Sequence, residues 1–394
     1  MIKEANFIVF SDDWGRHPFS CMHIMKQFLP RNRMLWVNTV GMRLPKFTLY
    51  DLWRSVEKLR SWFGHSTSKV GIPNNLTVIS PVTLPFSNVK QVRLFNKWSI
   101  IRAVKKEIER LKFKRPILLT TLPIAVDYIG AFKEIVDVYY CVDEFSKWPG
   151  VLKDLVERME RDLIQKSDLI VVTSEELQKT KKKDSVPTYL LPHGVEIEHF
   201  RKSQTLEPAP FIKNLKKPVI GYFGLFDERT DSELIDFMAK NRPEWTFAFI
   251  GPKKVETKVL ENYKNVFFSP PVPYIELPKH LAGIDVFIIP YKLNELTKYI
   301  NPLKLKECLA VGKPVVSTPL PEVLKLKQAV RIAWTKEEFL NQISEALSQP
   351  LDQSAVDKVL EGEDWSFKAE QVSQFIEEAI NKKNSSGKNM VEIV

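Results

Sequence analysis

One stretch in the C-terminal half of the chain combines residue types that can hold a phosphorylated ligand. Asp285–Pro319 reads DVFIIPYKLNELTKYINPLKLKECLAVGKPVVSTP, which predicts a buried strand, a polar loop, a helix with Pro302 near its first turn, and a stop at Gly312 before a second strand. The free N–H groups at a helix start attract anions, and Lys304 adds a cation there. Glu307, one turn on, can accept hydrogen bonds from the vicinal hydroxyls of a ribose. The segment therefore predicts a site for a nucleoside diphosphate.

A second glycine-containing strand end could complete this site. PVIGYFGLFDERTD predicts a buried strand at whose end Gly221 and Gly224 allow a phosphate to approach the backbone, with Arg229 in the following loop. Arg229 either binds that phosphate or pairs with Asp227 or Asp231 on a solvated turn.

Carboxylates and histidines follow two predicted strands of the N-terminal half. In VDVYYCVDEFSKWPG, Asp143 and Glu144 come directly after a buried strand, where a carboxylate could act as a general base. The alternative is that Asp143 caps the next turn or orders the site. The first loop, SDDWGRHPFSCMHIM, offers a set that could face a second substrate, although a histidine inside a predicted helix is more often packed. This set is Asp13, Arg16, His17 and His23.

Alternating strands and helices must position these groups. Apolar runs typical of parallel strands alternate with helical patterns and predict two doubly wound α/β domains, at 1–203 and 218–364. The proline-containing stretch 204–217 indicates a linker, a closing helix over 366–380 is expected to pack back on the first domain, and 381–394 reads as a fraying tail. Ligands of such sheets bind at the carboxyl ends of the strands, so the site is expected in a central cleft between the domains. Neither half contains the G-x-G-x-x-G turn of nicotinamide cofactor sites.

The segment NPLKLKECLAVGKPVVST resembles the nucleotide-binding helix of GT-B glycosyltransferases, in which a helix-borne glutamate holds the ribose. VDVYYCVDEF and GYFGLFDERTD extend the resemblance, most closely to bacterial cell-envelope enzymes of the teichuronic-acid type. It implies two Rossmann-like domains and assigns Glu307 to the ribose; the position where many retaining members carry a second glutamate is Tyr299 here. The loop PPVPYIELP is similar to the stretch that packs against the nucleobase. The implied nucleotide-sugar site comprises Gly224, Arg229, Val272, Tyr299, Asn301, Pro302, Leu303, Lys304 and Glu307.

The resemblance implies a glycosyltransferase that uses a nucleoside-diphosphate sugar, expected to be uridine-linked, in envelope polysaccharide assembly. Asp143 and Glu144 would serve catalysis, which suits a transfer that inverts the configuration of the sugar. The acceptor side would be formed by Asp13, Arg16, His17 and His23. No cofactor is expected, and metal should be dispensable because no Asp-x-Asp motif follows a strand. Two alternatives stay open: a sugar-nucleotide epimerase on the same fold, and a noncatalytic subunit that binds nucleotide or lipid.

Charge and apolar residues together favour an anionic membrane surface as a partner. The chain of 394 residues carries a net charge of +10, and residues 81–120 hold ten Lys or Arg against two Glu, a net +8. Aromatic and basic residues also interleave over 46–63, so both 46–63 and 89–115 are expected to contact lipid. No nucleic-acid module accompanies the charge. Three separated cysteines indicate a reducing compartment, so the expected location is cytoplasmic, peripheral at the inner face of the membrane, with a lipid-linked or saccharide acceptor.

Overall fold

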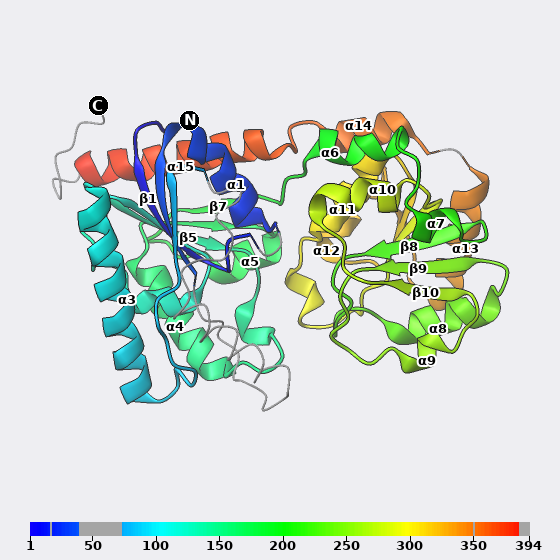
Figure 1. Ribbon diagram of the computed structural model, residues 1–394, viewed down its shortest axis with the longest axis horizontal. Coiled ribbons are helices and arrows are strands. Elements are labelled where there is room, and N and C mark those ends of the chain that lie inside the picture. The colour runs from blue at the N-terminus through cyan, green and yellow to red at the C-terminus, as the bar shows by residue number, and fades with distance from the viewer. Residues whose placement is uncertain (16–17, 39–72, 350, 386–394) are drawn as a thin grey trace. The chain divides into compact units, whose positions relative to one another are not determined.

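The computed structural model describes residues 1–15, 18–38, 73–349 and 351–385, and divides into two compact units (Figure 1). Unit 1 comprises Met1–Leu191 and Ala369–Val394, and unit 2 comprises Pro192–Lys368. Each unit contains one parallel sheet with helices packed on it, which confirms the predicted α/β class with two doubly wound domains.

The described part of unit 1 has a seven-stranded parallel sheet in the order β3-β2-β1-β4-β5-β6-β7. Its central strands form because their side chains are largely apolar on both faces, and Val9 at the centre lies opposite Trp36 and Leu119. The strands are β1 Asn6–Ser11, β2 Arg33–Asn38, β3 Leu76–Ile79, β4 Ile117–Thr120, β5 Val136–Cys141, β6 Leu169–Val172 and β7 Thr188–Leu190. The helices are α1 Ser20–Phe28, α3 Lys90–Leu111, α4 Lys153–Lys166 and α5 Glu175–Lys181, and α15 Trp365–Ser385 joins unit 1 from Ala369 on.

The described part of unit 2 has a six-stranded parallel sheet in the order β10-β9-β8-β11-β12-β13. The strands are β8 Val219–Phe223, β9 Thr246–Ile250, β10 Val266–Ser269, β11 Val286–Ile289, β12 Val315–Ser317 and β13 Arg331–Ile332. The longer helices are α8 Ser232–Asn241, α11 Leu303–Val311, α13 Lys336–Ser348 and α14 Gln353–Leu360. The shorter ones are α6 Ile197–Arg201, α7 Pro210–Lys213, α9 Lys258–Glu261, α10 Leu277–Leu281 and α12 Pro321–Leu324.

The stretch expected to link the domains belongs to unit 2. The boundary between the units falls after Leu191, whereas the sequence placed a linker at 204–217. Within that stretch α7 begins at Pro210, and Ile212 is buried in the core of unit 2, where its side chain lies against Gly283. Proline at a helix start is compatible with the helix, so the prolines here mark an ordered element.

The end of the chain is helical further than the sequence indicated. The closing helix was expected over 366–380, and α15 continues to Ser385. Ile376 and Ile380 are buried, and Lys383 forms an ion pair with Asp168, which gives the last turns partners in unit 1. The residues after Ser385 lie outside the described part of the chain.

Candidate functional site

Helix α11 starts at the carboxyl edge of the unit 2 sheet, because it follows β11 in a parallel strand–helix–strand unit with β12. Its N-cap residue is Pro302, which makes no side-chain capping hydrogen bond. The helix ends at Gly312, whose φ of 78° is the left-handed conformation that glycine adopts without strain. The first turn therefore presents main-chain N–H groups, with the partial positive charge of the helix terminus, to a ligand.

Lys304, the second residue of α11, is held over two tyrosine rings. Its ammonium donates a hydrogen bond to the hydroxyl of Tyr222 over 2.7 Å. The same nitrogen lies 4.1 Å from the ring centroid of Tyr222 and 5.3 Å from that of Tyr291. Burial acts to lower the pKa of Lys304, but the two tyrosines raise it above its ordinary value, so the side chain remains a cation.

Gly224 follows β8 and lies directly beside this cation. Its φ is +98°, and a Cβ built on it would lie 3.2 Å from the Lys304 nitrogen. A second glycine, Gly251 after β9, has φ +137° and packs so closely that a Cβ there would meet the carbonyl oxygen of Gly224. Gly224 thus keeps main chain, rather than a side chain, next to the ammonium group, and Gly251 allows the close contact between the two strand ends.

Arg229 lies in the same cluster but is engaged in an ion pair. Its Nη2 is 2.7 Å from Oδ2 of Asp227, and its Nε is 2.9 Å from Oδ1 of the same residue. Its guanidinium carbon also lies 5.8 Å from the ring centroid of Tyr291. Burial would raise the pKa of Asp227, yet the hydrogen bonds from Arg229 hold it below the ordinary value. The pairing with Asp227 that the sequence left open is therefore present, with the side chain of Arg229 21% exposed.

Glu307 is buried one turn into α11, with 7% of its surface exposed. Among the described residues, none donates a hydrogen bond to its carboxylate. Burial raises its pKa to about 8, against the effect of Lys304, which lowers it, and with a smaller contribution from Glu196, which raises it. A buried carboxylate is costly unless hydroxyl or N–H donors satisfy it, so this position is suited to a ligand that supplies donors.

The other residues expected around the nucleotide have varied surroundings. Tyr299 is buried and lies in a single helical turn before α11, with the Lys298 nitrogen 5.9 Å from its ring centroid. Asn301 and Val272 are half-buried, and Val272 packs against the unit 2 core. Tyr274, two residues after Val272, stacks on His199 with 4.6 Å between ring centroids. The pKa of Tyr274 is raised mainly by burial and secondly by the charge of Glu307.

In unit 1, Asp143 and Glu144 follow β5 at the carboxyl edge of the sheet and differ in environment. Asp143 is half-buried and accepts a hydrogen bond from the N–H of Glu144 over 2.9 Å. Glu144 is 5% exposed and forms an ion pair with Lys181 over 2.5 Å. Glu144 is thus engaged within the unit, and Asp143 is the more accessible of the two carboxylates.

The first loop of unit 1 is described in part. Asp13 is half-buried beyond the end of β1, and the neighbouring Asp12 carbonyl accepts a hydrogen bond from the Trp36 indole. His23 is only 2% exposed within α1, so its ring is packed. Arg16 and His17 lie outside the described residues, so their expected role stays a prediction.

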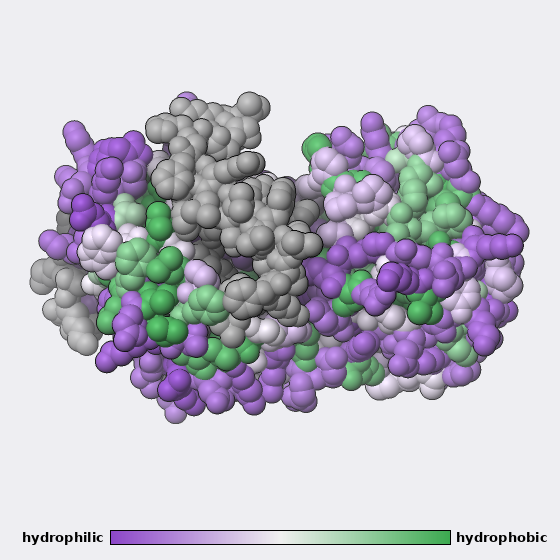
Figure 2. Space-filling model, turned by 60° about the horizontal axis from the view of Figure 1, so that its bottom comes forward, coloured by the Kyte–Doolittle hydropathy of each residue, from purple (hydrophilic) through white to green (hydrophobic). Residues whose placement is uncertain are grey.

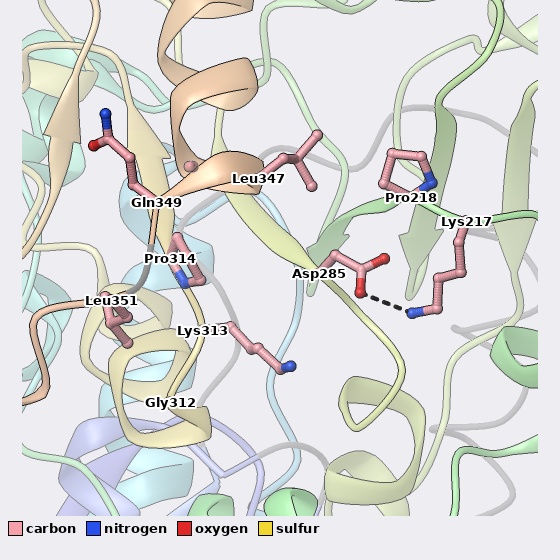
Figure 3. Close-up of a pocket in the computed structure, with 10 residues that line it drawn as sticks. Lys217, Pro218, Asp285, Gly312, Lys313, Pro314, Leu347, Gln349 and Leu351 are labelled. Atoms are coloured by element: carbon pink, nitrogen blue, oxygen red, sulfur yellow. Dashed lines mark hydrogen bonds and ion pairs between the residues drawn. The ribbon is translucent and has the colours of Figure 1, made fainter.

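A separate concavity of about 710 Å³ lies at the opposite, amino-terminal edge of the unit 2 sheet (Figure 3). Lys217 and Asp285 form an ion pair over 2.9 Å on its wall, and Lys313 extends from the turn after α11. Because ligands of parallel α/β sheets bind at the carboxyl edge, this hollow is distinct from the α11 site.

Sequence reasoning missed Tyr222, Tyr291 and Gly251. All three lie in or just after strands, where an aromatic residue or a glycine is normally explained by packing. The parallel order β9-β8-β11 brings the two tyrosines next to Lys304, and Gly251 next to Gly224. In the part of the chain that the structure describes, no group of three or more His, Cys, Asp or Glu is placed to hold a metal ion.

Comparisons with known proteins give one match inside unit 2 and others that extend over more of the chain. Residues 217–349 match the family model for glycosyl transferases group 1. A Bacillus subtilis (strain 168) protein named as a teichuronic acid biosynthesis glycosyltransferase, TuaH, is 27% identical over 240 residues; the match covers 57% of this chain and 60% of TuaH.

Solved structures resemble the whole chain. Sucrose-phosphate synthase from Thermosynechococcus elongatus aligns with a TM-score of 0.69 at 13% identity, covering 96% of this chain and 100% of that one. Anabaena HepE, in a structure with UDP and glucose, aligns with a TM-score of 0.63 at 12% identity, covering 94% and 99%. At these identities the likeness is one of fold.

Proposed function

We propose that this chain, which has the GT-B fold and carries a glycosyltransferase group 1 domain at residues 217–349, transfers a sugar from a nucleoside-diphosphate sugar to a saccharide acceptor. The observation that carries the proposal is the arrangement on α11. A helix start without a side-chain cap, the Lys304 ammonium beside Gly224, and the buried carboxylate of Glu307 follow one another within one and a half turns. A helix N-terminus and a cation are suited to the charges of a diphosphate, and a carboxylate is suited to the hydroxyls of a ribose.

The α11 site would stabilise the leaving nucleoside diphosphate. As the bond from the sugar to the diphosphate breaks, negative charge grows on the phosphate oxygens next to Lys304 and the helix N-terminus. Arg229 would add a second cation if its pair with Asp227 opens towards the phosphates. Asp143 in unit 1 would accept the proton of the acceptor hydroxyl as that oxygen attacks the sugar.

A uridine donor and an envelope acceptor are the finer parts of the proposal. HepE is described with UDP and glucose, and TuaH is named for teichuronic acid biosynthesis. We extend both features to this chain, with a lipid-linked or polysaccharide acceptor. No cofactor beyond the donor enters the proposed reaction.

An anionic membrane surface is proposed as the partner of α3. Its first turns and the preceding loop expose apolar side chains, with Leu94 56% and Trp98 57% exposed, beside Lys90 and Lys97. Arg102 lies over the Trp98 ring at 5.5 Å. Figure 2 shows hydrophobic side chains gathered on unit 1 next to hydrophilic ones. Exposed aromatic and cationic side chains on one helix suit the lipid interface at an inner membrane leaflet.

The apolar residues of α3 are divided between the core and the surface. Ile100 and Val104 are buried in the core, whereas Leu94 and Trp98 are exposed. Residues 46–63, the other expected membrane segment, lie outside the described residues. Among the helices of the described part, none combines the length and the apolar character needed to cross a bilayer.

Binding and transfer measurements test the proposal in two steps. Uridine, guanosine and adenosine diphosphates are titrated calorimetrically into the wild-type chain and into the Glu307→Ala and Asp143→Asn variants. We expect uridine diphosphate to bind most tightly, Glu307→Ala to lose binding, and Asp143→Asn to keep it. Transfer of labelled sugar from uridine-diphosphate sugars to lipid extracts is then expected in wild type and lowered about 100-fold or more in Asp143→Asn. Binding without any transfer, or donor turnover without an acceptor, would contradict the glycosyltransferase assignment.

A further inference from the structure

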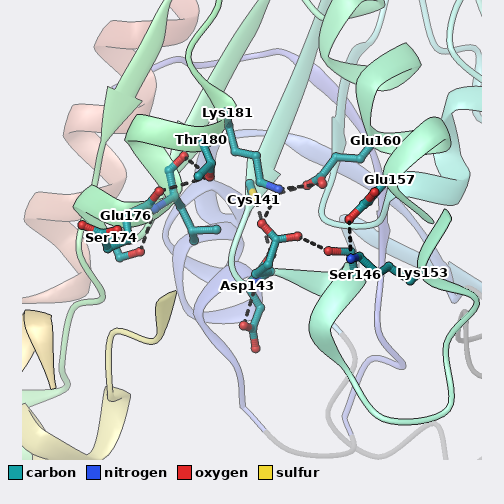
Figure 4. Close-up of polar contacts among 12 residues, drawn as sticks. Cys141, Asp143, Ser146, Lys153, Glu157, Glu160, Ser174, Glu176, Thr180 and Lys181 are labelled. Carbon is teal, nitrogen blue, oxygen red and sulfur yellow. Dashed lines mark hydrogen bonds and ion pairs between the residues drawn. The ribbon is translucent and has the colours of Figure 1, made fainter. Parts of the chain in front are cut away.

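A buried polar cluster lies beneath the loop that carries Asp143 (Figure 4). At its centre the Lys181 ammonium contacts Glu144 Oε2 over 2.5 Å and Glu160 Oε2 over 2.7 Å. Three different elements meet here, since Lys181 ends α5, Glu160 lies in α4 and Glu144 follows β5. We call these residues, together with three neighbours that hydrogen-bond to them, the Lys181 cluster: Tyr139, Cys141, Glu144, Ser146, Glu160 and Lys181.

Each carboxylate of the cluster has a second donor. The Tyr139 hydroxyl donates to Glu160 Oε1 over 2.6 Å, and the Ser146 hydroxyl donates to Glu144 Oε1 over 2.7 Å. The side chains of Lys181, Glu144 and Glu160 are 7%, 7% and 4% exposed. Burial raises the pKa of Glu160, and Lys181 opposes that rise. The network is therefore desolvated and closely satisfied.

Stability alone is a weak explanation for such a cluster. Burying ions carries a large desolvation cost, and apolar residues of similar volume are often as stable or more so. What the ions add is a fixed geometry, because only one arrangement of the three elements satisfies every group. Lys181 thus fixes where the loop after β5 lies relative to α4 and α5.

The loop that is fixed in this way carries the proposed base. The N–H of Glu144 donates to Asp143 Oδ1 over 2.9 Å, and the Cys141 thiol donates to the Asp143 carbonyl over 3.5 Å. Both Cys141 and Glu144 belong to the Lys181 cluster, so the main chain and the side chain of Asp143 are each tied to it. Asp143 itself is half-buried, at the carboxyl end of β5.

We propose that Lys181 is a positioning residue for transfer, holding Glu144 so that the loop presents the Asp143 carboxylate to the acceptor hydroxyl; this rests on the proposed function. In the step concerned, the acceptor oxygen forms a bond to the anomeric carbon and its proton passes to Asp143. The bond between that carbon and the diphosphate oxygen breaks, and the electron pair leaves with the nucleoside diphosphate. A displacement of the base by about 1 Å lowers the rate of such a step about 100-fold.

The test compares Lys181→Met with a matched variant two residues earlier on the same helix. Lys179 forms an exposed ion pair with Glu176 over 2.6 Å, so Lys179→Met removes a charge from α5 without touching the cluster. We expect Lys181→Met to lower kcat at least tenfold, with the donor KM and the uridine diphosphate Kd within twofold of wild type. Lys181→Arg is expected to restore part of kcat, and Lys179→Met to match wild type.

Two further variants separate positioning from a general effect on folding. Ser146→Ala removes one hydrogen bond to Glu144 and keeps the ion pair of Glu144 with Lys181. We expect kcat to fall about threefold with only a modest loss of thermal stability, and this variant carries the test if Lys181→Met does not fold. In the Asp143→Asn background, Lys181→Met should lower the residual kcat no further, because Lys181 acts through Asp143.

Unchanged kcat in both Lys181→Met and Ser146→Ala would overturn the positioning role. So would a double variant in which the kcat losses of Lys181→Met and Asp143→Asn combine in full. Absence of transfer in the wild-type chain, by contrast, would overturn the proposed function itself.

Discussion

Replacing Glu307 with glutamine tests the buried carboxylate through stability as well as binding. Burial raises the pKa of Glu307 from 4.5 to about 8, so the folded chain binds this proton more tightly than the unfolded chain. Stability from this group is therefore present at low pH and is lost as pH rises from about 4.5 through about 8. Between pH 5 and pH 9 the loss amounts to about 4 kcal/mol. Glutamine keeps the shape and has no such proton.

Urea unfolding of wild type and Glu307→Gln at pH 5, 7 and 9 measures this difference, since other titrating groups cancel between the two proteins. We expect the variant to gain about 4 kcal/mol relative to wild type over this range. In the same samples, the affinity of wild type for uridine diphosphate should rise about tenfold from pH 7 to pH 9, because the ionised carboxylate accepts both ribose hydroxyls.

The affinity of Glu307→Gln should be weak and independent of pH over that interval. Glu322→Gln is the matched control, a buried glutamate of unit 2 paired with Lys325 over 2.7 Å, and should leave uridine diphosphate affinity unchanged. A stability difference that does not vary with pH would mean that the carboxylate is satisfied or solvated in the folded chain, and Glu307 would then have no unmet need for ligand donors.

Three further substitutions test other parts of the account. Gly224→Ala places a methyl group on a residue with φ +98° beside Lys304, so it should cost about 1–2 kcal/mol of stability and weaken uridine diphosphate binding at least tenfold. Gly130→Ala is the control, because Gly130 has φ +83° and open space around it, and it should cost stability alone. Equal uridine diphosphate binding by the two variants would argue against a phosphate at this strand end. Measured by calorimetry, Lys304→Met should weaken the affinity for uridine diphosphate about 10- to 100-fold and the affinity for uridine monophosphate much less. An equal loss of affinity for both ligands would mean that Lys304 does not contact the diphosphate. Trp98→Ser should reduce co-sedimentation with vesicles containing anionic lipid, while Trp334→Ser, 66% exposed in unit 2, should not; equal retention by both would dismiss α3 as the membrane contact.

The sequence was most informative where burial is two-sided. Strands such as Val136–Cys141 and Val219–Phe223 are continuous apolar runs, and parallel sheets bury both faces, so their positions and the α/β class were predictable. The start and end of α11 were predictable for a local reason, since Pro302 and Gly312 mark them. The short helix α7 was not predicted, because four residues around a proline also suit a linker.

The site was predictable only where its residues are close in sequence. Lys304 and Glu307 lie on one helix, so their spacing alone indicated a shared ligand. The aromatic support of Lys304 comes from Tyr222 and Tyr291, which are far apart in the chain and meet through strand order. Glu144 looked equivalent to Asp143 in sequence, and only the fold reveals that Lys181 pairs with it.

We propose that α11 binds a nucleotide, with the diphosphate at its amino end and the ribose at Glu307. A crystal structure of the chain with uridine diphosphate measures this directly. We expect phosphate density beside Gly224 and Lys304, and the two ribose hydroxyls within hydrogen-bonding distance of the Glu307 carboxylate. Nucleotide density elsewhere, with Glu307 still lacking a donor, would contradict the account.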